Sequence, residues 1–388
     1  MKRGIATFTL DYGKAPPWLF ERMVKLSREM IRVLVFEYGS DEFVKRIADP
    51  VWFQSLGTVL AFDWNASGLT TVLTGALKEA IKGEENDLGV FICGGKGKAS
   101  RKTPSQIEGW AGVINLSKNM TDTLIKNSKM SAKVDSALVQ DGYSLYHHAF
   151  FFSKPSKNSK GAWAVVQQGM NTGNKTARRY HWYDTFSSKH DFVNEPHKGI
   201  ASQRFERNVL NLVAEKSSKN REVSMGLIGE GYQSMKNDIE LLRKYENSLT
   251  KMLSLGFKGD EYTAINLRRE DFKHHEVEFE NFITNGYLDK ILRKISDENP
   301  KSYEQLVATE GVGARTIRAI SLVSEVIYGA KPSYEDPARY SFAHGGKDAI
   351  PYAVEKEVYD KTIETIRNAV KKTKLSPLDK DKMLRRIS

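Results

Sequence analysis

Cysteine is almost absent from this chain, which has only Cys93 among its 388 residues. A single cysteine cannot form an intramolecular disulfide, and it excludes a zinc site built from several cysteines. Long apolar runs are absent as well, because no stretch approaches the ~20 apolar residues that a membrane-spanning helix needs. The first residues, Met1 to Ile5, lead into polar and glycine residues instead of the apolar core of a secretory signal. We therefore expect a cytoplasmic protein that has no membrane partner.

Internal repeats and low-complexity tracts are also missing. Hydrophobic residues make up 40% of the chain, with 16 tyrosines and 18 phenylalanines, a composition typical of folded rather than disordered protein. The length predicts two or three domains. The formal net charge of +11 favours a polyanionic partner, although such a charge can also serve solubility alone.

The N-terminal half combines amphipathic helices with short apolar strands. Apolar residues recur at helical spacing in two stretches, and two aromatic or valine-rich runs joined by a polar loop have the pattern of an antiparallel hairpin. The predicted elements are helices over residues 18–35 and 67–81, a buried strand over 88–93, and hairpin strands over 143–152 and 162–168. We expect residues 1–199 to form a mixed α/β domain that carries the catalytic site.

The C-terminal half has a different texture, in which long charged helices replace the strands. Candidate helices lie near residues 203–216, 221–254, 274–296, 301–308, 314–328 and 355–372. The predicted fold is therefore α+β, with an all-α, DNA-binding domain over residues 200–388.

A helix-hairpin-helix is predicted over residues 302–328 of this helical domain. Two amphipathic segments flank the turn Glu310-Gly311-Val312-Gly313. The glycines permit a tight turn, and they leave the N–H groups at the start of the next helix open to a phosphate oxygen. The residues expected to contact a nucleic-acid backbone are Gly311, Gly313, Arg315, Thr316 and Arg318. A helical hairpin without any ligand is the alternative.

A second basic segment, residues 94–104, follows the predicted buried strand. Its cations, Lys96, Lys98, Arg101 and Lys102, stand among glycines and hydroxyl residues that can surround phosphate. The segment lacks the Gly-Lys-Ser/Thr ending of a nucleotide-binding P-loop, since Ala99 follows Lys98. We expect nucleic-acid backbone binding here, with a solvated loop as the alternative.

Potential metal ligands gather near the predicted hairpin. Five of the eight histidines fall between residues 147 and 197. Phosphodiester cleavage commonly uses Mg²⁺ or Mn²⁺ held by carboxylates with help from imidazole or amide groups. The expected set is Asp135, Asp141 and His148, with Gln168 as a further catalytic candidate. Alternation along a strand places His147 and His148 on opposite faces. The alternative is an aromatic-rich sheet with hydrogen-bonded imidazoles.

A third candidate segment, residues 335–348, combines acidic, basic and cationic side chains around a glycine pair. His344 and Lys347 are its expected nucleic-acid contacts, and a solvent-exposed loop between helices is the alternative.

The stretch 302–340 resembles the helix-hairpin-helix DNA glycosylase superfamily, in which a Gly-Val-Gly turn precedes a helix, a glycine and an essential aspartate seven residues later. Gly311-Val312-Gly313, Gly329 and Asp336 have that order. The resemblance implies that Asp336 stabilises the sugar cation or activates water after the base is flipped out. The intervening helix is about three residues longer than in the superfamily, and Arg315 replaces the lyase lysine and cannot form its Schiff base.

Over nearly its full length the chain resembles a family of uncharacterised, mainly archaeal proteins, domain-of-unknown-function family 763. The resemblance rests on residues 13–20, 94–98, 146–148 and 340–348. It implies an archaeal-type cytoplasmic origin and leaves the chemistry open.

These observations favour a DNA-repair protein, a metal-dependent and structure-directed nuclease that holds the DNA backbone through the hairpin. One alternative is a monofunctional DNA glycosylase that uses Asp336, and another is a non-catalytic module that binds DNA structure. Structured RNA as the partner and the oligomeric state stay open.

Overall fold

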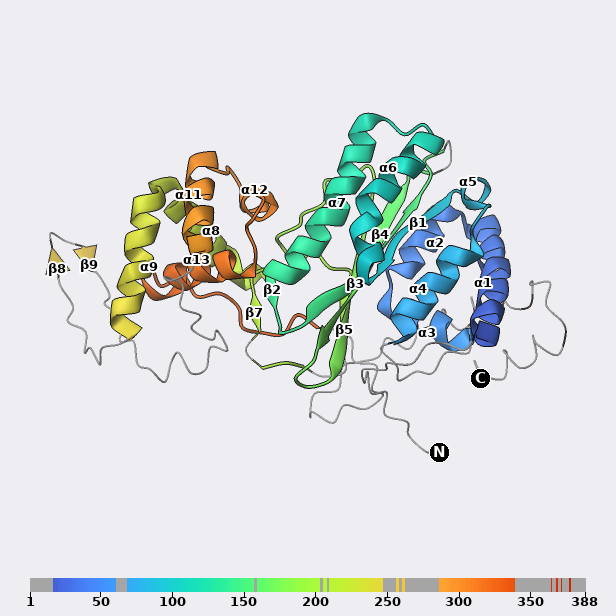
Figure 1. The fold of residues 1–388 in the computed structure, drawn as a ribbon, viewed down its shortest axis with the longest axis horizontal. Helices are drawn as coiled ribbons and strands as arrows, with labels where there is room; N and C mark the ends of the chain where they lie inside the picture. The colour runs from blue at the N-terminus through green and yellow to red at the C-terminus, as the bar shows by residue number, and fades with distance from the viewer. Residues whose placement is uncertain are drawn as a thin grey trace.

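The structure is a computed structural model in which a five-stranded sheet separates two layers of helices, with further helices beyond one edge (Figure 1). It describes residues 17–60, 68–156, 159–202, 205–207, 209–246, 256–257, 260–261 and 286–338, together with residues 364, 368, 371 and 377. Within that part of the chain, no helix is long and apolar enough to cross a membrane.

The sheet has the strand order β1-β3-β4-β5-β6, and every neighbouring pair is antiparallel. Its strands are β1 (Val90–Lys96), β3 (Ser144–Ser153), β4 (Ala162–Asn171), β5 (Thr176–Thr185) and β6 (Gly199–Ser202). The predicted hairpin is confirmed as β3 and β4. Side chains on both faces of the central strands are buried, because helices cover the two faces.

Four N-terminal helices cover the first face of the sheet. They are α1 (Pro17–Tyr38), α2 (Ser40–Ile47), α3 (Pro50–Val59) and α4 (Gly68–Ala80), followed by the short α5 (Glu85–Leu88). Their apolar stripes pack with the alternate residues Ile92, Phe151 and Val166 of the strands in one buried cluster. The spacing that predicted helices over residues 18–35 and 67–81 is confirmed in α1 and α4.

The second face is covered by α6 (Thr103–Val113) and α7 (Lys118–Ala137). α6 follows a 3-10 turn, η1 (Gly97–Lys102), and α7 begins where Ser117 accepts a hydrogen bond from the Met120 N–H. Neither helix was predicted, because lysine, serine and asparagine interrupt the apolar positions of α7.

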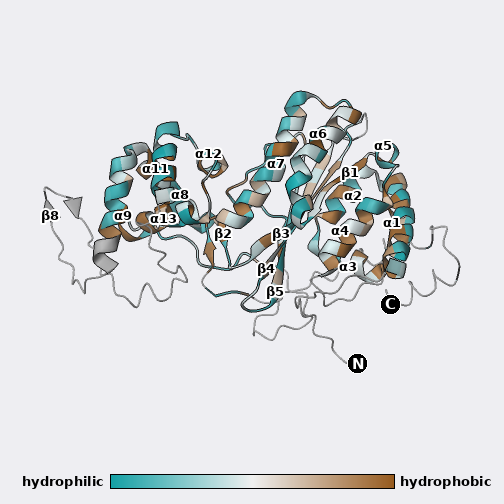
Figure 2. Cartoon of the chain, viewed as in Figure 1, coloured by the Kyte–Doolittle hydropathy of each residue, from teal (hydrophilic) through white to brown (hydrophobic). Residues whose placement is uncertain are grey.

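The helices beyond the sheet are α8 (Ser218–Glu230), α9 (Tyr232–Glu246), α11 (Gly286–Glu298), α12 (Tyr303–Ala308) and α13 (Ala314–Val326). The other short elements are β2 (Val139–Gln140), β7 (Leu210–Asn211), η2 (Glu215–Ser217), β8 (Gly256–Phe257) and β9 (Asp260–Glu261). Figure 2 shows hydrophilic and hydrophobic residues on different sides of several of these helices.

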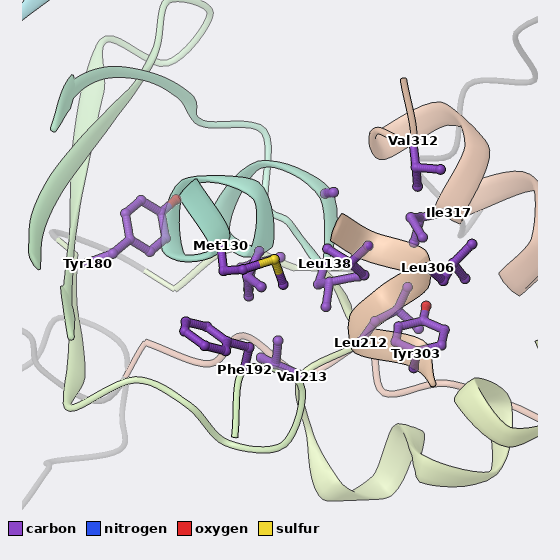
Figure 3. Close-up of a cluster of buried hydrophobic side chains, with 14 of the residues drawn as sticks. Met130, Leu138, Tyr180, Phe192, Leu212, Val213, Tyr303, Leu306, Val312 and Ile317 are labelled. Carbon is purple, nitrogen blue, oxygen red and sulfur yellow. The ribbon is translucent and has the colours of Figure 1, made fainter. Parts of the chain in front are cut away.

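One apolar cluster joins the second face of the sheet to these helices. Figure 3 shows it as a band that begins at Tyr180 of β5, passes Met130 of α7 and reaches Leu306 and Ile317 of α12 and α13. The predicted domain boundary between residues 199 and 200 stays a prediction, and β6 lies across it.

Two helix predictions in this region need correction. The helix predicted over residues 203–216 is wrong, because Leu210–Asn211 form strand β7 and the buried residues Leu212 and Val213 lie in a turn that follows it. The helix predicted over residues 221–254 is interrupted at Gly231, whose φ of 98° does not continue a helix.

Candidate functional site

A pocket of about 220 Å³ opens between α7, strand β3 and the basic segment that follows β1. Five elements line it: Ser100 and Arg101 come from η1, Pro104 from α6, Ser128, Lys129 and Ala132 from α7, Leu145 to His148 from β3, and Gln167 from β4. The fold therefore brings together the basic segment and the histidine-rich strand, which are two separate candidate sites in the sequence.

Gly94 explains how the basic segment reaches β3. Its φ is 83°, and a Cβ atom there would lie 2.3 Å from the carbonyl oxygen of His148. Only glycine allows this backbone approach. Gln106 of α6 accepts hydrogen bonds from the Gly94 N–H and from the Lys78 ammonium, at 2.8 Å each. These contacts hold the start of η1 and α6 beside the pocket.

A chain of hydrogen bonds runs from the pocket into the protein. Ser128 Oγ lies 2.8 Å from His148 Nε2, and His148 Nδ1 lies 2.8 Å from Gln167 Oε1. The amide nitrogen of Gln167 donates to Asp135 Oδ2 at 2.5 Å. Because the amide oxygen of Gln167 can only accept, His148 must carry its proton on Nδ1. His148 Nε2 is then an acceptor, and the Ser128 hydroxyl donates to it.

Asp135 ends this chain inside the protein. Besides Gln167, it accepts a hydrogen bond from Trp182 Nε1 at 3.0 Å, and His197 Nε2 lies 2.5 Å from its other oxygen. Burial raises the pKa of Asp135, while His197 and these donors oppose the rise. We name the four residues Ser128, His148, Gln167 and Asp135 the relay.

Burial also controls the protonation of His148. It lowers the pKa of His148 to about 4, although the hydrogen bond to Gln167 acts in the opposite direction. The imidazole is consequently neutral at pH 7, as the direction of the relay requires.

The prediction that His147 and His148 face opposite sides of the sheet is confirmed. His147 Nε2 lies 3.1 Å from Thr74 Oγ1 of α4, whereas His148 faces Ser128 of α7. Gln168, predicted as a catalytic residue, donates to the hydroxyl of Tyr146 at 2.5 Å. The structure places Gln167, the preceding residue, in the relay.

Asp141 and Asp336 lie together, away from the relay, around the fully buried Arg178 of β5. Arg178 Nη1 donates to Asp141 at 3.0 Å and to Asp336 at 2.9 Å, and Nη2 donates to the second oxygen of Asp336 at 2.6 Å. The Tyr180 hydroxyl donates to Asp141 at 2.6 Å, and the Glu206 N–H donates to Asp336 at 2.6 Å. We name Arg178, Asp141 and Asp336 the clasp.

The expected metal ligands are thus divided between two places. Asp135 and His148 belong to the relay and are joined only through Gln167, and Asp141 belongs to the clasp. In the described part of the chain, no three histidine, cysteine, aspartate or glutamate side chains gather in a way that could hold a metal ion. Asp135, Asp141 and His148 therefore do not come together as one metal site, and the binding of Mg²⁺ or Mn²⁺ stays a prediction.

The predicted hairpin residues form a turn between α12 and α13. Gly311 has a φ of 91°, and a Cβ atom there would lie 2.4 Å from Ile291 Cδ1. Gly313 is the residue before α13, and as a glycine it offers no side chain to cap that helix. Arg315 is exposed, whereas Thr316 is buried. Arg318 donates through Nε to Gln140 at 2.6 Å.

The remaining predicted contact residues fall in two groups. Lys98 and Lys102 are exposed on η1, Arg101 lines the pocket, and the Lys96 ammonium lies 5.9 Å from the centre of the Tyr146 ring. His344 and Lys347 lie outside the described residues.

Ser128 and Lys129 were missed because α7 was not predicted. A signal is present in the sequence: Ser117 can cap a helix, and Leu124, Met130, Val134 and Leu138 form a buried stripe. Within such a helix, Ser128 lies on the side that faces the sheet, as the relay shows.

The fold and the pocket define an α+β protein with a polar, partly cationic pocket between a sheet and its covering helices. The chain belongs to the family described as Protein of unknown function (DUF763), whose model matches residues 4–354. No curated protein and no solved structure matches the chain.

Proposed function

We propose that this protein is a DNA-processing protein that holds the phosphate backbone at the α12–α13 turn and acts on DNA in the pocket. One observation carries the proposal: the turn and the pocket adjoin the same two turns of α7. In Figure 1, α7 runs between α6 on one side and α12 on the other, and it contacts both.

One side of α7 contacts α12, and another side lines the pocket. Lys126 forms an ion pair with Glu304 of α12 at 2.6 Å, and Lys133 donates to the carbonyl oxygens of Val307 and Thr309 at 2.7 and 2.5 Å. Ser128, Lys129 and Ala132 line the pocket. Helical spacing places the exposed Lys129 between the two sides. A DNA backbone held at the α12–α13 turn would therefore have the Lys129 ammonium between it and the pocket.

Charge along this path supports a polyanionic ligand. Arg315 at the turn, Lys129 on α7, and Lys98, Arg101 and Lys102 at η1 are all exposed. None of the described residues that line the pocket is acidic. Cations and open N–H groups bind phosphate without reading sequence, so the proposed ligand is the DNA backbone rather than a particular base sequence.

The binding part of the proposal is tested by fluorescence anisotropy with a labelled duplex over a series of salt concentrations. Arg315→Ala should weaken binding uniformly across sequences and reduce the salt slope by about 1. The matched control is Arg22→Ala, which removes an exposed arginine from α1. Equal affinities for wild type and Arg315→Ala would remove the turn from the binding surface, and an RNA duplex that competes better than DNA would make RNA the partner.

The chemistry is tested on gels with intact, flap, forked and lesion-bearing DNA, with and without Mn²⁺ and before and after alkali. Direct breaks that need Mn²⁺ support the metal-dependent nuclease. Breaks seen only after alkali support a glycosylase, and Asp336→Asn should then abolish them. DNA that is retarded and stays intact in every lane supports a binding module.

A further inference from the structure

We infer that the pocket is a nucleophilic centre in which Ser128 attacks the phosphorus of a phosphodiester and His148 accepts the serine proton. The phosphodiester as substrate rests on the proposed function. The assignment of nucleophile and base rests on the pocket alone.

The hydrogen bond of Ser128 distinguishes it from other hydroxyl side chains of its helix. Thr121, Thr123, Ser131 and Ser136 all donate to the backbone carbonyl oxygen four residues earlier, which is the common bond of a hydroxyl within a helix. The Ser128 hydroxyl instead donates to the nitrogen of a neutral imidazole at 2.8 Å. That is the geometry of a nucleophile beside its base.

The next members of the relay orient the base. His148 donates from Nδ1 to Gln167 Oε1, and Gln167 in turn is held by Asp135. An acceptor at Nδ1 keeps Nε2 free of a proton and directs it towards the serine. Gln167 and Asp135 are thus positioning residues, whereas Ser128 and His148 are the groups that would form the new bond and transfer the proton.

The surroundings suit a phosphoryl group. Ser128 and His148 are 3% and 7% exposed and both line the pocket, so they are shielded from bulk water yet reachable. Arg101 and Lys129 line the same pocket and can compensate the negative charge that develops on the phosphoryl oxygens.

The reaction balances without an oxidant or reductant. The Ser128 Oγ–P bond forms while the bond from phosphorus to the leaving sugar oxygen breaks. The serine proton passes to His148 Nε2 and then to the leaving oxygen, which becomes a free hydroxyl. Water then attacks the phosphoserine diester and gives a proton to His148, which returns it to Ser128 Oγ as the Oγ–P bond breaks.

The nucleophile is tested with a fluorophosphonate probe on the full chain. Serine attack forms an Oγ–P bond and releases fluoride, so wild type should gain one adduct that peptide mapping places at Ser128. Ser128→Ala should abolish the adduct, and His148→Gln should slow labelling by about 100-fold or more. Ser131→Ala is the matched control, because Ser131 is equally buried one turn further along α7 and donates only to backbone carbonyls. An unlabelled wild type, or an adduct that persists in Ser128→Ala, would overturn the inference.

The substrate class is tested with duplex DNA that carries a 5′-bridging phosphorothiolate, in EDTA. Attack by Ser128 expels the sulfur as a free 5′-thiol, which religates poorly, so a thiol-reactive dye should detect thiol release and rapid denaturation should capture the Ser128–DNA adduct before water hydrolyses it. DNA that binds without releasing the thiol would overturn the phosphodiester assignment and leave the proposed DNA binding intact. An adduct at Ser128 that Arg315→Ala does not slow would support the inference and contradict docking at the turn.

Discussion

The relay and the clasp each contain a carboxylate buried on the second face of the sheet, yet they have different neighbours. Asp135 accepts hydrogen bonds from neutral donors and from His197, and its chain of contacts leads to the pocket. Asp141 faces Arg178, whose guanidinium also binds Asp336, so its charge is matched inside the protein. Burial alone therefore does not mark a functional carboxylate, because the hydrogen-bond and charge partners decide what the carboxylate can do.

The two clusters also connect different parts of the chain. The clasp joins β5 to the segment after β2 and to residue 336, far along the sequence. The relay joins α7, β3 and β4 at the pocket. We therefore expect changes in the clasp to affect stability first, and changes in the relay to affect the pocket first.

The largest expected effect comes from removing the cation of the clasp. Arg178→Met leaves Asp141 and Asp336 buried without their counter-charge and should lower the free energy of unfolding by about 3–5 kcal/mol. Asp135→Asn keeps the shape of the relay carboxylate and should cost only about 1–3 kcal/mol. Urea unfolding followed by circular dichroism measures both. Equal losses would remove the distinction between clasp and relay.

The buried His148 of the relay should make the stability of the protein depend on pH. The folded pKa of His148 is about 4, below the ordinary value of 6.5. Below pH 6.5 the imidazole of His148 takes up a proton in the unfolded chain, whereas in the folded chain it does so only near pH 4. The free energy of unfolding therefore falls as the pH falls from 6.5 to about 4. His148 alone should lower the free energy of unfolding by roughly 1 kcal/mol for each pH unit in this window.

His148→Gln should therefore show a shallower loss of stability between pH 6 and pH 5 than wild type, in urea unfolding at each pH. The clasp carboxylates titrate alike in both proteins, so their contribution cancels when the two slopes are compared. The same slope in both proteins would contradict a neutral, buried His148.

The smallest expected effect is on the proton position within the relay. Gln167→Leu removes the acceptor at His148 Nδ1 and should cost about 1 kcal/mol of stability, while the nitrogen-15 NMR spectrum should lose the single tautomer with its proton on Nδ1. A purely packing role for Gln167 would leave the tautomer unchanged. Arg178→Met, in the clasp, serves as the control that should keep the tautomer.

Sequence patterns predicted the fold where the apolar signal was uninterrupted. The aromatic run of β3 and the helical spacing of α1 were sufficient. β5 was not predicted, because Arg178 and Arg179 are charged residues in a strand buried on both faces. Their main partners come from distant parts of the chain: Asp141 and Asp336 bind Arg178, whereas Thr70 and Gln54 of the N-terminal helices bind Arg179.

The site was predicted in part for a related reason. Asp135 and His148 were expected to be close, and the relay brings them within one chain of hydrogen bonds. Alternation along β4 puts Gln167 on the same face as Val165 and its pairing partner His148, and Gln168 on the other face with Val166. Two adjacent glutamines give no apolar signal of their own, and only the packing of α7 shows which face carries the pocket.

Hydrogen–deuterium exchange of the full chain, with and without a saturating DNA duplex, would show whether DNA lies across both the turn and the pocket. We expect slower exchange in peptides that cover residues 97–102 and 311–316 together, because one backbone would contact η1, Lys129 and the turn. Unchanged exchange in these peptides when DNA is bound, or protection of only one of the two, would contradict the claim.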